Sequence, residues 1–302
     1  MENKIIYMYG MILVTNSFLL KNEFPQADGY AEIKEKYILT GGETGTASIV
    51  LANLGCRLML DGTHQGTVTA PIIKECFGKF NVDTSKLTYD ENFRGCEDYV
   101  MIDRNTRTIL GSFEDFFTVK HWNTPRREDI AAANTVGLDP FFHEESVLAA
   151  RYCKELNKKY ATIDCDYDSE LNRLCEINAV SRAYLEERYP GESYADLHKK
   201  YTGNTDGLVI FTMGSDSVMY GRKGEEIKLF PAYRIQPVST LGAGDCFKAG
   251  TVYALNEGMS DEEIVSFASA TAAVACLGYP IEYNPPTLDK ITALQNSQRK
   301  LS

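Results

Sequence analysis

The chain has 302 residues and a mass of 33.8 kDa, with 44% hydrophobic and 24% charged residues. These ordinary globular values exclude a disordered, collagen-like or coiled-coil chain. Thirty-one lysines and arginines against 42 aspartates and glutamates give a net charge of −11, so the overall field does not favour binding to nucleic acid or to an anionic membrane.

Apolar runs alternate with helical patterns along most of the chain, which predicts parallel βαβ units and an α/β fold. In chain order the expected elements are a strand at 5–9, a helix at 43–54, a strand at 58–60, a helix at 71–80, a strand at 136–138, a helix at about 144–159, strands at 161–163 and 208–211, a strand edge at 234–238, a helix that stops at Gly258, and a last helix opened by the capping box of Ser260 and Glu263.

Two stretches, about 11–40 and 93–118, break this alternation because each reads as extended strands without a helix between them. Antiparallel strands at these places predict a small sheet beside the main layers that serves as a lid over a cleft. No linker divides the sequence, so one domain over residues 1–302 is expected. Exposed lid strands offer edges for pairing, and a homodimer through the lid is therefore expected.

The uncharged stretch 5–20 is shorter than the roughly 18–20 residues that span a bilayer, and polar residues interrupt it. The eight cysteines include no C-x-x-C pair and the four histidines form no H-x-x-x-H pattern, so a structural zinc site is not expected. Free buried thiols fit a reducing cytoplasm, although an even number of cysteines could also pair in a secreted protein. We expect a soluble, cytoplasmic protein.

The most specific motif is the small-residue turn at 239–247, STLGAGDCF, which opens a predicted helix. Unpaired backbone N–H groups and the helix dipole make such a turn an anion site, and its glycines allow close approach of a phosphate. A carboxylate beside an anion site would repel phosphate, so Asp245 is expected to act as a general base toward an attacking hydroxyl. The alternative is an ordinary helix start with Asp245 as a first-turn acid.

The segment TLGAGDCFKAG resembles the signature of the PfkB, or ribokinase-like, carbohydrate kinases. Four further segments resemble family motifs in the same order: Gly41-Gly42 before a helix, NTRTI at 105–109 like the lid strand, Thr212-Met213-Gly214 like the nucleotide turn, and the small-residue helix at 268–275. The resemblance covers roughly residues 5–280. It implies a three-layer α/β/α fold with a mainly parallel central sheet and a small β-sheet lid.

The resemblance also implies an ATP-dependent sugar kinase that phosphorylates a hydroxyl with the help of Mg²⁺. Asp245 would be the base, and the backbone of Gly242, Ala243 and Gly244 would form the anion hole. The implied nucleotide contacts are Asn178, Thr212, Gly214 and Thr240. The implied sugar contacts are Gly41, Gly42, Thr15, Asn16, Thr46 and Arg107. No residue is assigned to the metal ion.

Four positions depart from the family pattern. Thr15 stands where the first strand usually carries a sugar-binding aspartate, and Thr46 replaces an asparagine. Ser181 replaces the glutamate of an N-x-x-E motif that would begin at Asn178, and Ser239 stands at a position linked to a monovalent cation. Two interpretations stay open: a kinase with an unusual pocket for fructose, ribose or a related ketose or keto-acid sugar, or a catalytically weak homologue that binds a ligand. A nucleoside kinase of the same fold is a further alternative.

Several other side chains allow two interpretations. Lys248 either approaches phosphate or is a solvated helix residue. Trp122, the single tryptophan, either stacks on a sugar or packs in the core. His64 occupies a loop after a strand, where it would border the substrate or be structural. Asp164 and Asp166 either face the nucleotide or are ordinary loop acids.

Overall fold

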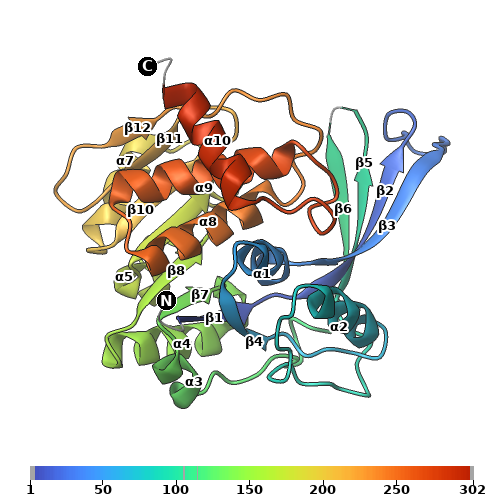
Figure 1. The fold of residues 1–302 in the computed structure, drawn as a ribbon, viewed down its shortest axis with the longest axis horizontal. Helices are drawn as coiled ribbons and strands as arrows, with labels where there is room; N and C mark the ends of the chain where they lie inside the picture. The colour runs from blue at the N-terminus through green and yellow to red at the C-terminus, as the bar shows by residue number, and fades with distance from the viewer. Residues whose placement is uncertain (1–3, 105, 114, 300–302) are drawn as a thin grey trace.

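The main sheet of the computed structural model, which describes residues 4–104, 106–113 and 115–299, has eight strands in the order β12-β11-β10-β9-β8-β7-β1-β4 (Figure 1). The strands are β1 (Ile5–Gly10), β4 (Arg57–Gly62), β7 (Thr135–Leu138), β8 (Lys159–Ile163), β9 (Ile177–Ser181), β10 (Leu208–Thr212), β11 (Val218–Gly221) and β12 (Lys228–Phe230). Neighbours from β4 to β10 pair in parallel, while β11 and β12 pair antiparallel. The mainly parallel central sheet is therefore confirmed.

Helices cover both faces of this sheet, as Figure 1 shows for α8 and α9 on one side and α3 and α4 on the other. The helices are α1 (Glu43–Asn53), α2 (Thr69–Lys79), α3 (Arg127–Ala132), α4 (His143–Glu155), α5 (Glu170–Leu174), α6 (Arg182–Arg188), α7 (Tyr194–Gly203), α8 (Ala243–Glu257), α9 (Asp261–Cys276) and α10 (Leu288–Arg299), with a short 3-10 turn at Pro140–Phe142. Because strand side chains alternate, Ile6 and Met8 of β1 pack with residues of α1, α8 and α9, and Tyr7 and Tyr9 pack with residues of α3, α4 and α5. The three-layer arrangement is confirmed.

The small sheet consists of β2 (Leu13–Leu20), β3 (Ile33–Gly41), β5 (Glu97–Ile102) and β6 (Arg107–Ser112), in the order β3-β2-β5-β6. It projects from one end of the main body (Figure 1). The expected strands are confirmed, but the expectation of purely antiparallel pairing is wrong, because β2 and β5 are parallel. The chain between them passes through α1, β4 and α2, and a crossover of this kind returns in the original direction. β3 and β6 are the outer strands, and the homodimer through them stays a prediction.

The segments around the last helices differ from expectation in one respect. The strand edge at 234–238 is wrong, because this segment is irregular and the Val238 N–H donates to the carbonyl of Cys276 at 2.7 Å instead of pairing with a strand. The capping box of Ser260 and Glu263 is confirmed at the start of α9, and Gly258 ends α8 in the left-handed region at φ 72°. All eight cysteines are free. Among the described residues, no helix combines the length and apolar character that a bilayer crossing requires.

Candidate active site

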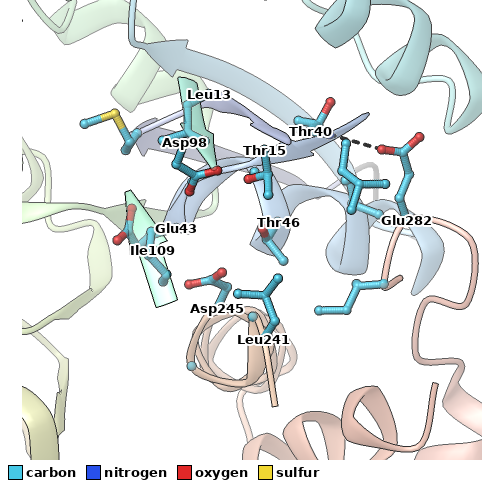
Figure 2. Close-up of a pocket in the computed structure, with 18 of the residues that line it drawn as sticks. Leu13, Thr15, Thr40, Glu43, Thr46, Asp98, Ile109, Leu241, Asp245 and Glu282 are labelled. Atoms are coloured by element: carbon cyan, nitrogen blue, oxygen red, sulfur yellow. Dashed lines mark hydrogen bonds between the residues drawn. The ribbon is translucent and has the colours of Figure 1, made fainter. Parts of the chain in front are cut away.

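A cavity of about 490 Å³ lies between the small sheet and the main body (Figure 2). Its walls come from the four strands of the small sheet, the start of α1, the turn before α8 and the loop at 279–282. The cavity brings together most of the site residues predicted from the sequence, namely Thr15, Gly41, Gly42, Thr46, Arg107, Gly242, Ala243, Gly244 and Asp245. Segments that are far apart in the sequence thus meet around one cavity.

The turn that opens α8 presents unpaired donors to this cavity. Gly242 has φ 74°, and a Cβ there would lie 2.6 Å from Ile281 Cδ1, so only glycine fits without strain. The backbone N–H groups of Gly244 and Asp245 have no hydrogen-bond partner among the described residues. The Ala243 N–H, which was predicted for the anion hole, instead donates to the Thr240 carbonyl at 3.3 Å. A Cβ on Gly244 would meet nothing within 4 Å, which means that open space lies in front of the turn. These donors and the helix dipole suit an anion that enters from the cavity.

Asp245 lies in the first turn of α8 beside a second carboxylate. Burial raises the pKa of Asp245 to about 7; the charge of Lys248 opposes this rise, the charge of Asp139 adds to it, and a hydrogen bond from the Thr46 hydroxyl opposes it. Burial and the charge of Asp245 also raise the pKa of Glu43, which lines the same cavity. A carboxylate with a pKa near neutrality suits proton transfer at physiological pH. Figure 2 shows both carboxylates on the cavity wall.

A buried ion pair near the start of α8 links this helix to the end of β7 and to α1. Lys248 of α8 and Asp139, which follows β7, are both fully buried and form a salt bridge. The Lys248 ammonium also donates to Thr44 Oγ1 at 2.9 Å, while the Thr44 hydroxyl and the Met11 N–H each donate to Asp139 Oδ2 at 2.8 Å. The interpretation of Lys248 as a solvated lysine is wrong, and Lys248 does not line the cavity. Neither Asp139 nor Thr44 was predicted from the sequence.

A carboxylate from a neighbouring strand accompanies Thr15 on the wall formed by the small sheet. The register of β2 and β5 pairs Thr15 with Asp98, so the two side chains lie on the same face of the small sheet. Burial raises the pKa of Asp98 to about 6, and its Oδ1 is buried without a hydrogen-bond partner among the described residues. Gly41 is required here, since a Cβ on it would lie 2.0 Å from Thr15 Oγ1. Asp98 was missed because strand pairing, not sequence proximity, places it beside Thr15.

Five predicted contacts do not line the cavity, namely Asn16, Asn178, Thr212, Gly214 and Thr240. Asn16 follows Thr15 on a strand and so points to the opposite face, where its amide donates to Glu97 Oε1 at 3.0 Å. Asn178 lies within β9 with no exposed surface, and its amide donates to Asn172 Oδ1 at 3.0 Å. Ser181, and not Asn178, is the last residue of β9, and its side chain caps the start of α6.

The predicted nucleotide residues lie at two places. Thr212 ends β10 and Gly214 follows at φ 64°, so both lie at the carboxyl edge of the parallel strands, where ligands of α/β sheets bind. Thr240 accepts a hydrogen bond from Arg107 Nη1 at 3.0 Å, which links β6 to the turn before α8. Asn105, the first residue of the segment that resembles the lid strand, lies outside the described residues.

The remaining side chains singled out in the sequence have structural partners. Trp122 is 6% exposed and stacks in a cluster of aromatic rings, which confirms the packing interpretation. Asp164 accepts hydrogen bonds from the N–H and the hydroxyl of Ser181 at 2.6 and 3.1 Å. Asp166 forms an ion pair with Arg188 at 2.7 Å. These contacts account for both aspartates without a ligand.

Comparison with known proteins agrees with this architecture. A model of the pfkB family carbohydrate kinases matches residues 38–280. The ribokinase of Bacillus subtilis is 31% identical over 86 residues, which cover 28% of this chain and 29% of that protein, so the match spans less than a third of the relative's length. The Arabidopsis thaliana ribokinase, solved with ribose and ATP, aligns over 98% of this chain and 99% of that chain with a TM-score of 0.80 and 18% identity. A nucleoside kinase of Methanocaldococcus jannaschii aligns over 97% and 98% of the two chains with a TM-score of 0.79 and 17% identity. At these identities both structures show the fold alone.

Proposed function

Because this chain belongs to the pfkB family of carbohydrate kinases, we propose that it transfers the γ-phosphate of ATP to a hydroxyl of a small sugar. One observation carries the proposal: a carboxylate of raised pKa, Asp245, lies on the cavity wall within the same turn as unpaired N–H donors. An anion site alone would bind phosphate without activating a nucleophile. A base beside the anion site can also remove the proton from the hydroxyl that attacks the phosphate.

In the proposed reaction Asp245 accepts the proton of the sugar hydroxyl as its oxygen attacks the γ-phosphorus. The bond from the γ-phosphorus to the bridging oxygen breaks, and ADP and a sugar phosphate result. The N–H groups of Gly244 and Asp245 stabilise the charge that develops on the transferred group. Mg²⁺ bound to the ATP phosphates would neutralise charge there. Thr212 and Gly214, at the carboxyl edge of the sheet, are the proposed nucleotide contacts.

The charge of the cavity favours a neutral sugar over an acidic one. Among the described residues, four acidic side chains line it, those of Glu43, Asp98, Asp245 and Glu282, against one guanidinium, that of Arg107. Carboxyl groups accept hydrogen bonds from sugar hydroxyls whether or not they are ionised, whereas an anionic substrate would be repelled by those that are ionised in a cavity of low dielectric. We therefore place ribose, fructose and related neutral sugars before keto-acid sugars. Thr15 stands where related kinases usually carry a sugar-binding aspartate, and Asp98, which pairs with Thr15 across the sheet, is proposed to take that role.

The direct test is ADP release with a panel of substrates that differ in charge. The panel contains ribose, fructose, a nucleoside and a keto-acid sugar, each with ATP and Mg²⁺. We expect turnover with a neutral sugar and none with the acid. Turnover with the keto-acid sugar alone would contradict the charge argument. ATP binding by calorimetry without turnover on any panel member would instead support the catalytically weak homologue.

Asp98→Asn is expected to raise KM for the sugar by about 10-fold or more with a smaller change in kcat. A hydrogen bond to a charged group contributes about 1.5–3 kcal/mol, and its loss from both ground and transition states appears in KM. Steady-state kinetics with the substrate found in the panel measures both constants. Glu97→Gln is the matched control, because Glu97 is the neighbouring acid on the opposite face and bonds Asn16. Equal KM values for the two variants would remove Asp98 from the sugar site.

A further inference from the structure

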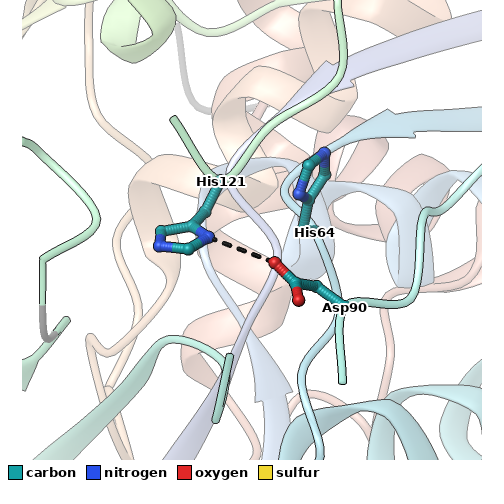
Figure 3. A group of neighbouring side chains, drawn as sticks. All are labelled: His64, Asp90 and His121. Atoms are coloured by element: carbon teal, nitrogen blue, oxygen red, sulfur yellow. Dashed lines mark ion pairs between the residues drawn. The ribbon is translucent and has the colours of Figure 1, made fainter. Parts of the chain in front are cut away.

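Two imidazoles and a carboxylate converge at a place that the proposed phosphotransfer does not use (Figure 3). His64 follows β4, Asp90 lies in the loop between α2 and β5, and His121 lies between β6 and α3. One ligand atom of each lies within 4.8 Å of the others, and none of the three residues lines the large cavity. We propose that these side chains bind a divalent metal ion of the zinc class.

Backbone hydrogen bonds hold the three segments together at the ligand residues themselves. The His64 N–H donates to the carbonyl of His121 at 2.8 Å, and the Asp90 N–H donates to the carbonyl of Gln65 at 2.9 Å. The Gln65 N–H in turn donates to the carbonyl of Thr88 at 2.7 Å. The ligand residues are therefore placed before any ion arrives, which lowers the conformational cost of forming the site.

The ring nitrogens are oriented as a metal requires. His121 is 8% exposed and stacks on Phe93 with ring centroids 4.0 Å apart. Its Nε2 lies 3.0 Å from Asp115 Oδ1, an arrangement that directs the Nε2 proton to this carboxylate and leaves Nδ1 free for a metal. Nδ1 of His64 and Nδ1 of His121 are both buried without a hydrogen-bond partner among the described residues.

The ligand set and its spacing select the ion. Two imidazoles with one carboxylate suit zinc, whereas magnesium and calcium prefer oxygen ligands. Tetrahedral zinc with bonds of about 2.1 Å keeps its ligand atoms about 3.4 Å apart. His121 Nδ1 and Asp90 Oδ2 already lie 3.5 Å apart, so closing the other separations requires side-chain shifts of only about 1 Å. A pocket of about 380 Å³ lined by His64 and residues 88–91 provides access for the ion and for a water as the fourth ligand.

Zinc binding is tested on the chelator-stripped full-length protein, without reference to activity. We expect one zinc per chain by elemental analysis after gel filtration, together with a higher Tm when zinc is added. Asp90→Asn and His121→Gln should each weaken zinc binding by about 10-fold or more in competition with a chromophoric chelator, since each removes one ligand. Asp90→Asn keeps the Oδ1 atom that accepts the Asn92 N–H at 2.9 Å, so this variant preserves the loop.

The control is His143→Asn, which removes an exposed histidine outside the cluster and should leave zinc affinity unchanged. Cobalt distinguishes the ligands: nitrogen and oxygen ligands give weak visible bands, whereas thiolate ligation by the free cysteines gives an intense near-ultraviolet band. The thiolate band, affinity that is unchanged in Asp90→Asn and His121→Gln, or no zinc retained by the unmodified chain would each overturn the proposal. None of these results bears on the proposed kinase reaction.

Discussion

Asp245→Asn is expected to lower kcat by about 10²- to 10⁴-fold while ATP still binds. General base catalysis contributes rate increases of this size, and asparagine cannot accept the hydroxyl proton at neutral pH. The substitution preserves side-chain volume and removes a charge that opposes a phosphate at the neighbouring N–H donors, so the affinity for ATP should not fall. Single-turnover ADP formation and calorimetric titration of ATP measure the two effects separately. Turnover equal to that of the unmodified protein would eliminate Asp245 as the base.

The pH dependence follows from the raised pKa of Asp245, which burial brings to about 7. A base acts when deprotonated, so kcat should fall as the pH drops below this value, by about tenfold per pH unit, and level off above it. Glu43 also has a pKa raised by burial and is the competing candidate. We expect Glu43→Gln to keep the acidic limb and Asp245→Asn to lose it. The reverse result would assign the base to Glu43.

Local patterns predicted five strands of the main sheet, β1, β4, β7, β8 and β10, and the turn before α8, but not β9, β11 or β12. Alternating apolar runs identify buried parallel strands from a few residues, and TLGAGD specifies a glycine-opened helix. The prediction of a strand at 234–238 was wrong because an extended sequence pattern does not say which strand it pairs with. The Val238 N–H instead donates to the carbonyl of Cys276 at the end of α9. The expectation of antiparallel pairing in the small sheet failed for the same reason, since the parallel pairing of β2 with β5 depends on a crossover through α1, β4 and α2.

The site was predictable only where one segment carries the chemistry. Asp245 stands out in its turn, but Asp98 becomes a candidate only through its register with Thr15 on another strand. Asn178 was proposed because it matches the first residue of the family's N-x-x-E motif, but it lies inside β9, and the residue that ends this strand is Ser181. The proposed metal site was not predicted because spacing rules for zinc rely on ligands close in sequence, whereas backbone hydrogen bonds bring His64, Asp90 and His121 together from three distant segments.

The sequence suggested that Lys248 either contacts solvent or approaches phosphate, but the side chain is buried in an ion pair with Asp139. Its substitution is therefore expected to change the stability of the fold more than any other variant proposed. Lys248→Met should lower the free energy of unfolding by about 3–5 kcal/mol, because it leaves Asp139 buried without its counter-ion. Methionine nearly preserves the length of the apolar stem, so the loss reflects charge more than a cavity. Urea unfolding followed by circular dichroism gives the midpoint and the m-value, and an unchanged m-value assigns the shift to stability.

The matched control is Lys200→Met, which breaks the exposed pair of Lys200 with Glu192 and should cost less than about 1 kcal/mol. Lys248→Met combined with Asp139→Asn should recover part of the loss, because it removes the uncompensated charge. Asp139 also accepts hydrogen bonds from the Met11 N–H and the Thr44 hydroxyl, which asparagine can retain through its carbonyl oxygen. If the double variant is as unstable as the sum of the single variants, the two side chains are not coupled, and the ion pair does not hold α8 to the end of β7.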